Sequence, residues 1–143
     1  MTQPQAIDFP GRGRVAVLRT RPETVIDDYA RLMRSVDYRS ALPDDHDTLL
    51  KVNISWQTWY PACSSAPWQI DGVIQTMLAD GYSPSSLMAA HNRTVVVDAY
   101  VGELNNGQRQ VVVDKHGLRN VHLYEPEVEW VEYEPRAPMR VLH

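Results

Sequence analysis

The chain has 143 residues, of which 43% are hydrophobic and 22% are charged, and its formal net charge is -4. These values are typical of one globular domain and exclude a general nucleic-acid-binding protein, which carries a basic surface. The single cysteine excludes an internal disulfide and a four-thiolate metal site within one chain. No apolar stretch reaches the ~18 residues that a membrane span requires. We therefore expect a cytoplasmic protein that binds neither nucleic acid nor a membrane.

The first elements of the chain follow a polar N-terminal segment. Residues 1–12 are interrupted by Pro and Gly, which predicts a flexible lead-in before a single domain over 13–143. The apolar run Arg14–Leu18 predicts a short strand. Pro22 suits the first turn of a helix, and apolar residues at helical spacing extend that helix to about residue 36.

A polar loop separates this helix from the next strand. Its acidic residues and His46 are residue types that bind metals, but a solvated loop explains them better, and we predict no metal site. The run 48–54 predicts a buried strand. The helix expected over 66–80 has Ser64 or Ser65 as its cap and Pro67 in its first turn.

The second half of the chain continues this alternation. Residues 94–113 are ambiguous because the composition favours strands, whereas Asn105 or Asn106 followed by Gly117 favours a helix over about 108–116. Further strands are expected at 85–90, 120–124, 127–133 and 139–142. The order predicts an α/β domain with a mostly parallel sheet of about four or five strands and helices on both faces, either a whole domain or part of one.

Polar residues gather after the second predicted strand. Lys51, Asn53 and Ser55 alternate, so they share one face of the strand. If that strand lies inside the sheet, these groups need a partner or a ligand, whereas at an edge they would meet solvent. In parallel sheets the ligand crevice lies outside the carboxyl ends of the strands. We therefore regard the three residues as candidate ligand-binding groups.

The loop over 55–66 ends in further reactive side chains. Ser64 and Ser65 precede the predicted helix, whose free N–H groups favour an anion, and they are candidate anion-binding residues. Cys63 is a candidate catalytic thiol or a small buried turn residue. His91 is the candidate catalytic base, with Asn92 as a ligand-binding neighbour, because both follow the third strand at the same sheet edge.

Several motifs together carry a resemblance. They are VAVLR, LLKVNIS, Ser-Ala-Pro before a helix that ends in Gly-Tyr, AHNRTVVVDAYVGELNN, KHGL and LYEPEVEWVEYEP. Over residues 13–142 the chain resembles the N-terminal portion of the prokaryotic domain-of-unknown-function family three-six-two, whose members are often joined to ferredoxin-like iron–sulfur segments. The resemblance implies a bacterial α/β domain, possible links to redox or cofactor chemistry, and no established reaction or cofactor. With one cysteine, the chain would hold a cluster only by sharing it with another chain.

Two functions follow from these expectations. The first is the anion-binding portion of an enzyme, with its site between the end of the 48–54 strand and the start of the 66–80 helix. The second is a non-catalytic module that docks a partner chain, or a second copy of itself, through the aromatic loop that contains Trp56, Trp59 and Tyr60. Lys51→Ala separates them through loss of binding with an intact fold, and the oligomeric state tests the second.

Overall fold

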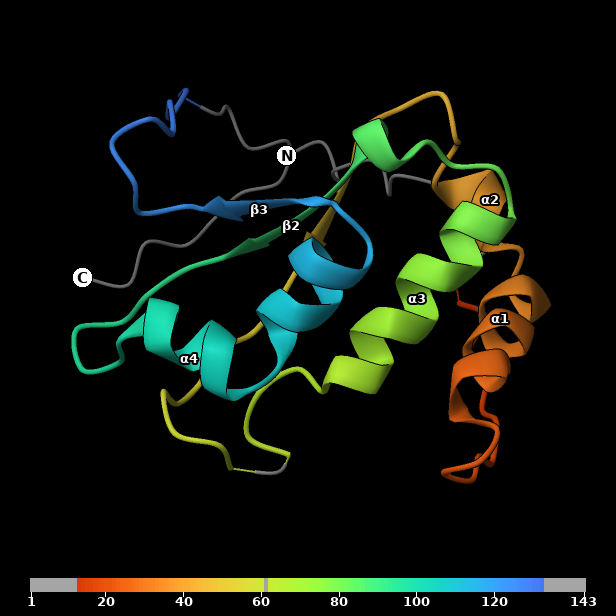
Figure 1. The fold of residues 1–143 in the computed structure, drawn as a ribbon. Coiled ribbons are helices and arrows are strands. Elements are labelled where there is room, and N and C mark those ends of the chain that lie inside the picture. Colours follow the sequence, from red (N-terminus) through yellow and green to blue (C-terminus); the bar gives the residue numbers. More distant parts are fainter. Residues whose placement is uncertain (1–12, 61, 133–143) are drawn as a thin grey trace, which may run out of the picture.

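A computed structural model describes residues 13–60 and 62–132. Its helices and strands follow the order α1 (Val25–Ser35), α2 (Tyr38–Ala41), β1 (Thr48–Lys51), α3 (Pro67–Ala79), the 3-10 turn η1 (Pro84–Ser86), β2 (Leu87–His91), α4 (Ala99–Asn105), the π-helix η2 (Gln110–Lys115) and β3 (Arg119–His122). Figure 1 shows this arrangement. The α/β class predicted from the sequence is confirmed.

The sheet is parallel and has the order β1-β2-β3. Thr48 lies opposite Leu87 in the first pair, and His91 lies opposite His122 in the second. Each connection between neighbouring strands contains helices, as parallel pairing requires. All three strands therefore end at the same edge of the sheet, and β1 is an edge strand of the described sheet instead of an interior one.

The predicted count of four or five strands is wrong for the described residues, which form three. Arg14–Leu18 is not a strand, and Val15 and Val17 are almost fully exposed. Residues 127–132 also form no strand, and the strand expected at 139–142 lies outside the described residues. The physical reason is that a β-rich composition creates a strand only where a neighbouring strand accepts its hydrogen bonds.

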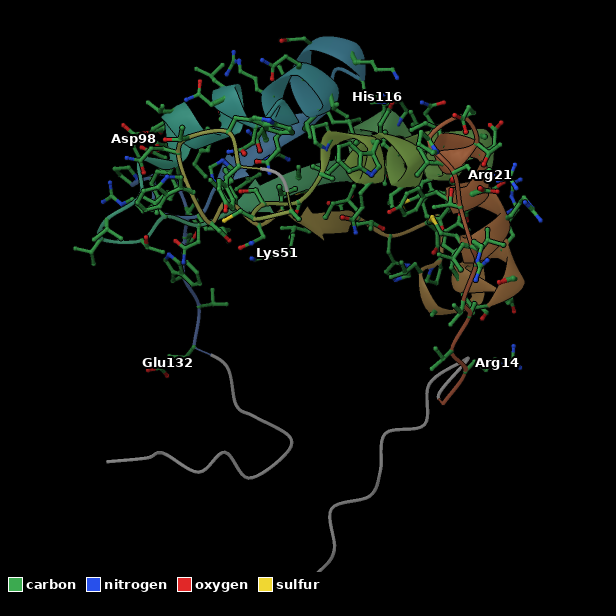
Figure 2. The ribbon with its side chains drawn as sticks, turned by 90° about the horizontal axis from the view of Figure 1, so that it is seen from below. Arg14, Arg21, Lys51, Asp98, His116 and Glu132 are labelled. Atoms are coloured by element: carbon green, nitrogen blue, oxygen red, sulfur yellow. The ribbon has the colours of Figure 1, made fainter. Side chains whose placement is uncertain are left out.

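The helices that pack on the sheet lie on one side of it. In Figure 2, α3, α4 and η2 lie above the strands, and the side chain of Lys51 points away from them. The described helices therefore correct the prediction of helices on both faces. The core between these helices and the sheet contains apolar residues of α3, β2 and η2, among them Ile74, Met77, Leu87, Ala89 and Val112.

The predicted helices agree with the structure better than the predicted strands do, because helix ends depend on local sequence signals. Pro67 lies in the first turn of α3, and Gly81 ends that helix with φ at +98°. Gly117 ends the helical segment over 108–115 with φ at +64°. Asp98, which the sequence analysis did not single out, caps α4 by accepting a hydrogen bond from the N–H of Val101 at 3.1 Å.

None of the helices within the described ranges combines the length and the apolar composition that crossing a bilayer requires.

Candidate functional site

A crevice of about 800 Å³ lies at the carboxyl ends of the three strands. Its lining comes from the connection that follows each strand: Gln57 after β1, the segment 93–100 after β2, and Tyr124 after β3. The volume is within the range of small-molecule sites. The location is the one that the rule for open parallel sheets predicts for a ligand.

Two buried polar atoms in the lining have no hydrogen-bond partner among the described residues. They are the side-chain oxygen of Gln57 and the hydroxyl of Tyr124. Leaving such atoms unpaired costs about 1 to 3 kcal/mol each. Burial, together with the negative charges of Glu103 and Glu125, raises the pKa of Tyr124, so its hydroxyl stays protonated and can donate. The wall of the crevice therefore contains one acceptor and one donor that the described residues do not use, both buried below its accessible surface.

The crevice also contains one cation and one anion. The guanidinium of Arg93 lies over the ring of Tyr124, 4.9 Å from its centroid, and Arg93 has no ion pair with a described carboxylate. Asp98 is the anion, and one of its oxygens is engaged as the cap of α4. Val95 and Val96 at the rim are exposed apolar residues. The wall is thus suited to a ligand that has both a polar, charged end and an apolar part.

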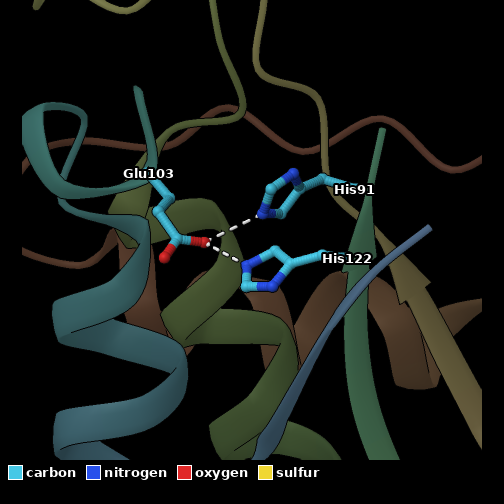
Figure 3. A group of neighbouring side chains, drawn as sticks. All are labelled: His91, Glu103 and His122. Atoms are coloured by element: carbon cyan, nitrogen blue, oxygen red, sulfur yellow. Dashed lines mark hydrogen bonds and ion pairs between the residues drawn. The ribbon is translucent and has the colours of Figure 1, made fainter. Parts of the chain in front are cut away.

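Behind the crevice, two histidines and a glutamate converge, as Figure 3 shows. His91 and His122 end neighbouring strands in register, and Glu103 projects from α4. One oxygen of Glu103, Oε2, lies 2.8 Å from Nε2 of His91 and 3.0 Å from Nε2 of His122. His91 and Glu103 are almost completely buried, whereas the side chain of His122 is 18% exposed.

A third donor reaches the same oxygen. Asn120 donates from Nδ2 to Oε2 of Glu103 at 2.6 Å, whereas the other oxygen, Oε1, has only Arg109, at 3.7 Å, as a partner among the described residues. Burial alone would raise the pKa of Glu103, but the hydrogen bonds from His91 and His122 and the charge of His122 lower it to about 2. Glu103 is therefore an anion at neutral pH, inside a cluster of nitrogen donors.

Aromatic packing connects this cluster to the crevice. The ring of Tyr100 lies 4.6 Å from that of His122, and the ring of Tyr124 lies 5.7 Å from it, centroid to centroid. Both tyrosines also line the crevice. The hydroxyl of Tyr100 donates to Glu125, which holds this wall between α4 and the segment after β3. The tyrosines therefore lie between the ligand crevice and the histidine cluster.

The long loop after β1 is held by buried amides of the α4–η2 region. Asn106 donates to the carbonyl oxygen of Trp56 at 2.9 Å, and Gln108 donates to the carbonyl oxygens of Asn53 and Ser65 at 3.1 Å each. Both amide side chains are buried. Gly102 allows a close approach, because a Cβ at that position would lie 2.5 Å from Cγ2 of Ile54.

The structure gives the predicted anion-binding serines a different set of contacts. The hydroxyl of Ser65 accepts the N–H of Asn53 at 2.9 Å, and the hydroxyl of Ser64 accepts the N–H of Ser55 at 3.2 Å. The side chain of Asn53 donates to Ser55 at 2.7 Å. The predicted serine cap of α3 is wrong, because the cap residue is Ala66 and makes no side-chain hydrogen bond.

Lys51 is exposed and points away from the helices (Figure 2). It borders a shallow hollow of about 240 Å³ beside β1 and the start of α3, which Ser65 also lines together with mostly apolar neighbours. Lys51 and Ser65 thus share one hollow, but it is separate from the crevice at the carboxyl edge. The edge position of β1 lets the lysine meet solvent without a buried partner.

The remaining predicted residues lie on the loops. Cys63 is a half-buried free thiol in a turn where its N–H bonds the carbonyl of Tyr60, and within the described residues no hydrogen bond joins it to His91. His91 is the last residue of β2, one residue beyond the predicted strand end, and Asn92 follows it with its side-chain oxygen accepting the N–H of Arg93 at 2.8 Å. The catalytic roles of Cys63 and His91 stay predictions.

Four residues of the crevice and the cluster were not predicted from the sequence: Glu103, His122, Arg93 and Tyr124. A signal for His122 existed, because NVHLY was predicted as a strand that would end near His91. Glu103 could not be predicted, because the secondary structure of its segment was ambiguous. In addition, its spacing along the chain does not show that a residue of α4 lies beside histidines at two strand ends.

Comparisons with protein-family models, with curated proteins and with solved structures found no significant match. The described residues form an α/β domain with a three-stranded parallel sheet and a crevice at its carboxyl edge. The resemblance described above stays an expectation.

Proposed function

We propose that this domain binds a small organic anion that also carries a hydrogen-bond donor, in the crevice between Gln57, Arg93 and Tyr124. The observation that supports the proposal most directly is the pair of buried polar atoms without a described partner, Gln57 Oε1 and the Tyr124 hydroxyl, in the wall of a crevice of about 800 Å³, where a side-chain rotation would bring them to a ligand. Arg93 would pair with a carboxylate or phosphate, and Gln57 would accept from an amine or a hydroxyl.

The proposal differs from the site expected at the start of α3. Ser64 and Ser65 already accept backbone N–H groups there. Arg93, in contrast, has no described carboxylate partner, and a guanidinium over an aromatic face is positioned for a second, anionic contact. The chemical class of the ligand therefore follows from Arg93 and Gln57 together.

NMR titration of the full chain with four probes tests this function. The probes are inorganic phosphate, acetate, lactate and free alanine, of which the last two carry an anion and a donor. Saturable shifts of the Gln57 side-chain amide and of the 93–99 backbone, strongest for lactate or alanine, are expected. Arg93→Gln should abolish them, and Arg119→Gln, at an exposed arginine on β3, should not. Non-saturable shifts, or identical shifts in Arg93→Gln, would overturn the proposal.

A second candidate function is supported by a different surface. Trp56, Trp59 and Tyr60 in the loop after β1 are 44%, 49% and 67% exposed. Exposed aromatic groups of this size favour docking of a partner chain or of a second copy. Light scattering over a concentration series tests self-association, which Trp59→Ser should weaken. A monomeric mass at every concentration, with the same mass in Trp59→Ser, would argue against self-association.

A further inference from the structure

Two imidazole nitrogens and one carboxylate oxygen lie within 4.8 Å of one another at the end of the sheet: Nε2 of His91, Nε2 of His122 and Oε2 of Glu103. We propose that these three atoms bind a divalent first-row transition-metal ion, with Zn²⁺ as the representative case. Two histidines and one glutamate form a ligand set that such ions use in three-residue sites with an open position.

The spacing of the three residues is close to what an ion requires. Two ligands that are each 2.0–2.1 Å from a metal lie about 2.8 to 3.0 Å apart at octahedral angles and about 3.3 to 3.4 Å apart at tetrahedral angles. The Nε2–Oε2 distances are 2.8 Å for His91 and 3.0 Å for His122. The two nitrogen–oxygen spacings therefore fit an ion with shifts of only tenths of an ångström, whereas the two imidazole nitrogens, which lie within 4.8 Å of each other, would have to stand no more than about 3.4 Å apart.

Hydrogen bonding alone explains poorly why several nitrogen donors converge on one carboxylate oxygen. A carboxylate oxygen has about two lone-pair sites, but Oε2 of Glu103 faces three nitrogen donors, from His91, His122 and Asn120. Within the described part of the chain, the other oxygen of the same carboxylate has only Arg109, at 3.7 Å. An ion between Oε2 and the two imidazoles would replace two of these crowded hydrogen bonds by coordination.

The site would bind an ion through neutral imidazole rings and an ionised carboxylate. Each imidazole would bind the ion through Nε2 as the neutral ring, with its proton on Nδ1. Glu103 would stay anionic, and Asn120 would continue to donate to it as an outer-shell partner. Imidazole ligands disfavour Mg²⁺ and Ca²⁺, which take oxygen ligands, and favour Zn²⁺ and its first-row neighbours.

One feature limits the expected affinity. Nδ1 of His91 is buried and has no hydrogen-bond partner among the described residues. Metal-binding histidines usually donate this second N–H to an acceptor, and loss of such a partner typically costs about 10- to 100-fold in affinity. We therefore expect a weaker site than one with a complete outer shell.

Access to the ion would come from the side of His122. Its side chain is 18% exposed and packs against Tyr100 and Tyr124, which line the crevice. The metal site does not depend on the anion site, since none of its three ligands lines the crevice. Failure of either proposal therefore leaves the other intact, and the probes in the two experiments differ.

Titration of the metal-free full chain with Co²⁺ and Zn²⁺ tests the proposal. Co²⁺ should give visible d–d absorption, and competition with a chromophoric chelator should show one Zn²⁺ per chain. His122→Gln and Glu103→Gln should each weaken Zn²⁺ binding by about 100-fold or more, since outer-shell changes alone cost 10- to 100-fold. The matched control is His116→Gln, because Nε2 of His116 also bonds a carboxylate, Asp71, at 2.7 Å.

A measurement on the wild-type chain avoids the possibility that a substitution disturbs folding. In the wild-type chain, Zn²⁺ should shift the ring C–H resonances of His91 and His122 and leave those of His116 unchanged. Absence of Co²⁺ absorption, an unaltered affinity in folded His122→Gln, or a shift at His116 in place of the other two would each overturn the proposal.

Discussion

His91 and His122 are register partners at the ends of neighbouring parallel strands, and both direct Nε2 toward the same oxygen of Glu103. Parallel pairing creates this relationship, because it brings the last residues of β2 and β3 to the same edge and side of the sheet. Helix α4, between those strands in sequence, then supplies the carboxylate. The cluster of His91, His122 and Glu103 therefore forms because the connection from β2 to β3 contains α4.

The first prediction concerns the contribution of Glu103 to stability. In metal-free protein, Glu103→Ala removes the acceptor shared by His91, His122 and Asn120 and leaves a buried donor unpaired. We expect the free energy of unfolding to fall by about 3 kcal/mol. Urea denaturation followed by circular dichroism measures it. Glu127→Ala, at an exposed glutamate, should change stability by less than about 0.5 kcal/mol. Equal losses in the two variants would contradict the prediction.

The second prediction concerns the contact between α4 and the loop after β1. In Gly102→Ala the new Cβ would lie 2.5 Å from Cγ2 of Ile54 and 3.4 Å from the carbonyl oxygen of Trp56. Overpacking costs about 1 to 3 kcal/mol, which exceeds the gain of about 1 kcal/mol in helix propensity. Denaturant unfolding should therefore show a net loss of stability.

A double-mutant cycle identifies the cause of that loss. Ile54→Ala removes the clashing methyl group and costs about 2 to 5 kcal/mol by itself, because Ile54 is buried. If the overlap is responsible, the double variant with Gly102→Ala loses less than the sum of the two single losses. Strict additivity would show that Gly102 acts through another contact.

The third prediction concerns acid sensitivity at the contact between α1 and α3. Arg34 donates to Asp80, with Nη2 at 2.6 Å from Oδ1, and the hydroxyl of Tyr38 donates to Oδ2 at 2.9 Å. The hydrogen bonds from Arg34 lower the pKa of Asp80, against the opposing effect of burial. The stabilisation is therefore complete above the unfolded-state pKa of about 4 and is lost as the pH falls below it.

Asp80→Asn should consequently reduce stability at pH 7 and make the decrease between about pH 5 and pH 3 smaller than in the wild type. Urea unfolding at a series of pH values measures both effects. Asp27→Asn is the matched control on α1, because Asp27 is exposed and has no ion pair with a described residue. An unchanged acid slope in Asp80→Asn would refute the assignment.

The fourth prediction tests whether Ser65 stabilises the fold or binds an anion. Ser65 joins the end of the β1 segment to the start of α3 through two contacts with Asn53, of which the hydroxyl makes one. Ser65→Ala should lower the free energy of unfolding by about 1 kcal/mol and leave phosphate binding unchanged. Thermal unfolding and the phosphate titration measure the two quantities. Loss of phosphate binding in a fully stable Ser65→Ala would instead support the site first expected at α3.

Several elements of the fold could be predicted from local sequence. Pro67 and Gly81 mark the ends of α3, and Gly117 marks the end of the helical segment over 108–115. Such signals act through the backbone conformation of a few neighbouring residues, so they do not depend on the rest of the chain. The parallel sheet followed from the alternation of strands and helices, and its carboxyl edge from the parallel order.

Strand number and the site depended on contacts between distant residues. Val15 and Val17 have strand-forming side chains but remain exposed, because no described strand pairs with them. Lys51 was expected either to need a partner inside the sheet or to meet solvent at an edge, and it meets solvent because β1 lies at the edge of the described sheet. The sequence by itself determined the helix ends, the α/β class and the sheet edge on which polar groups gather. Only the tertiary structure brought Glu103 to His91 and His122, because a helix face and two strand ends become neighbours through packing and not through spacing along the chain.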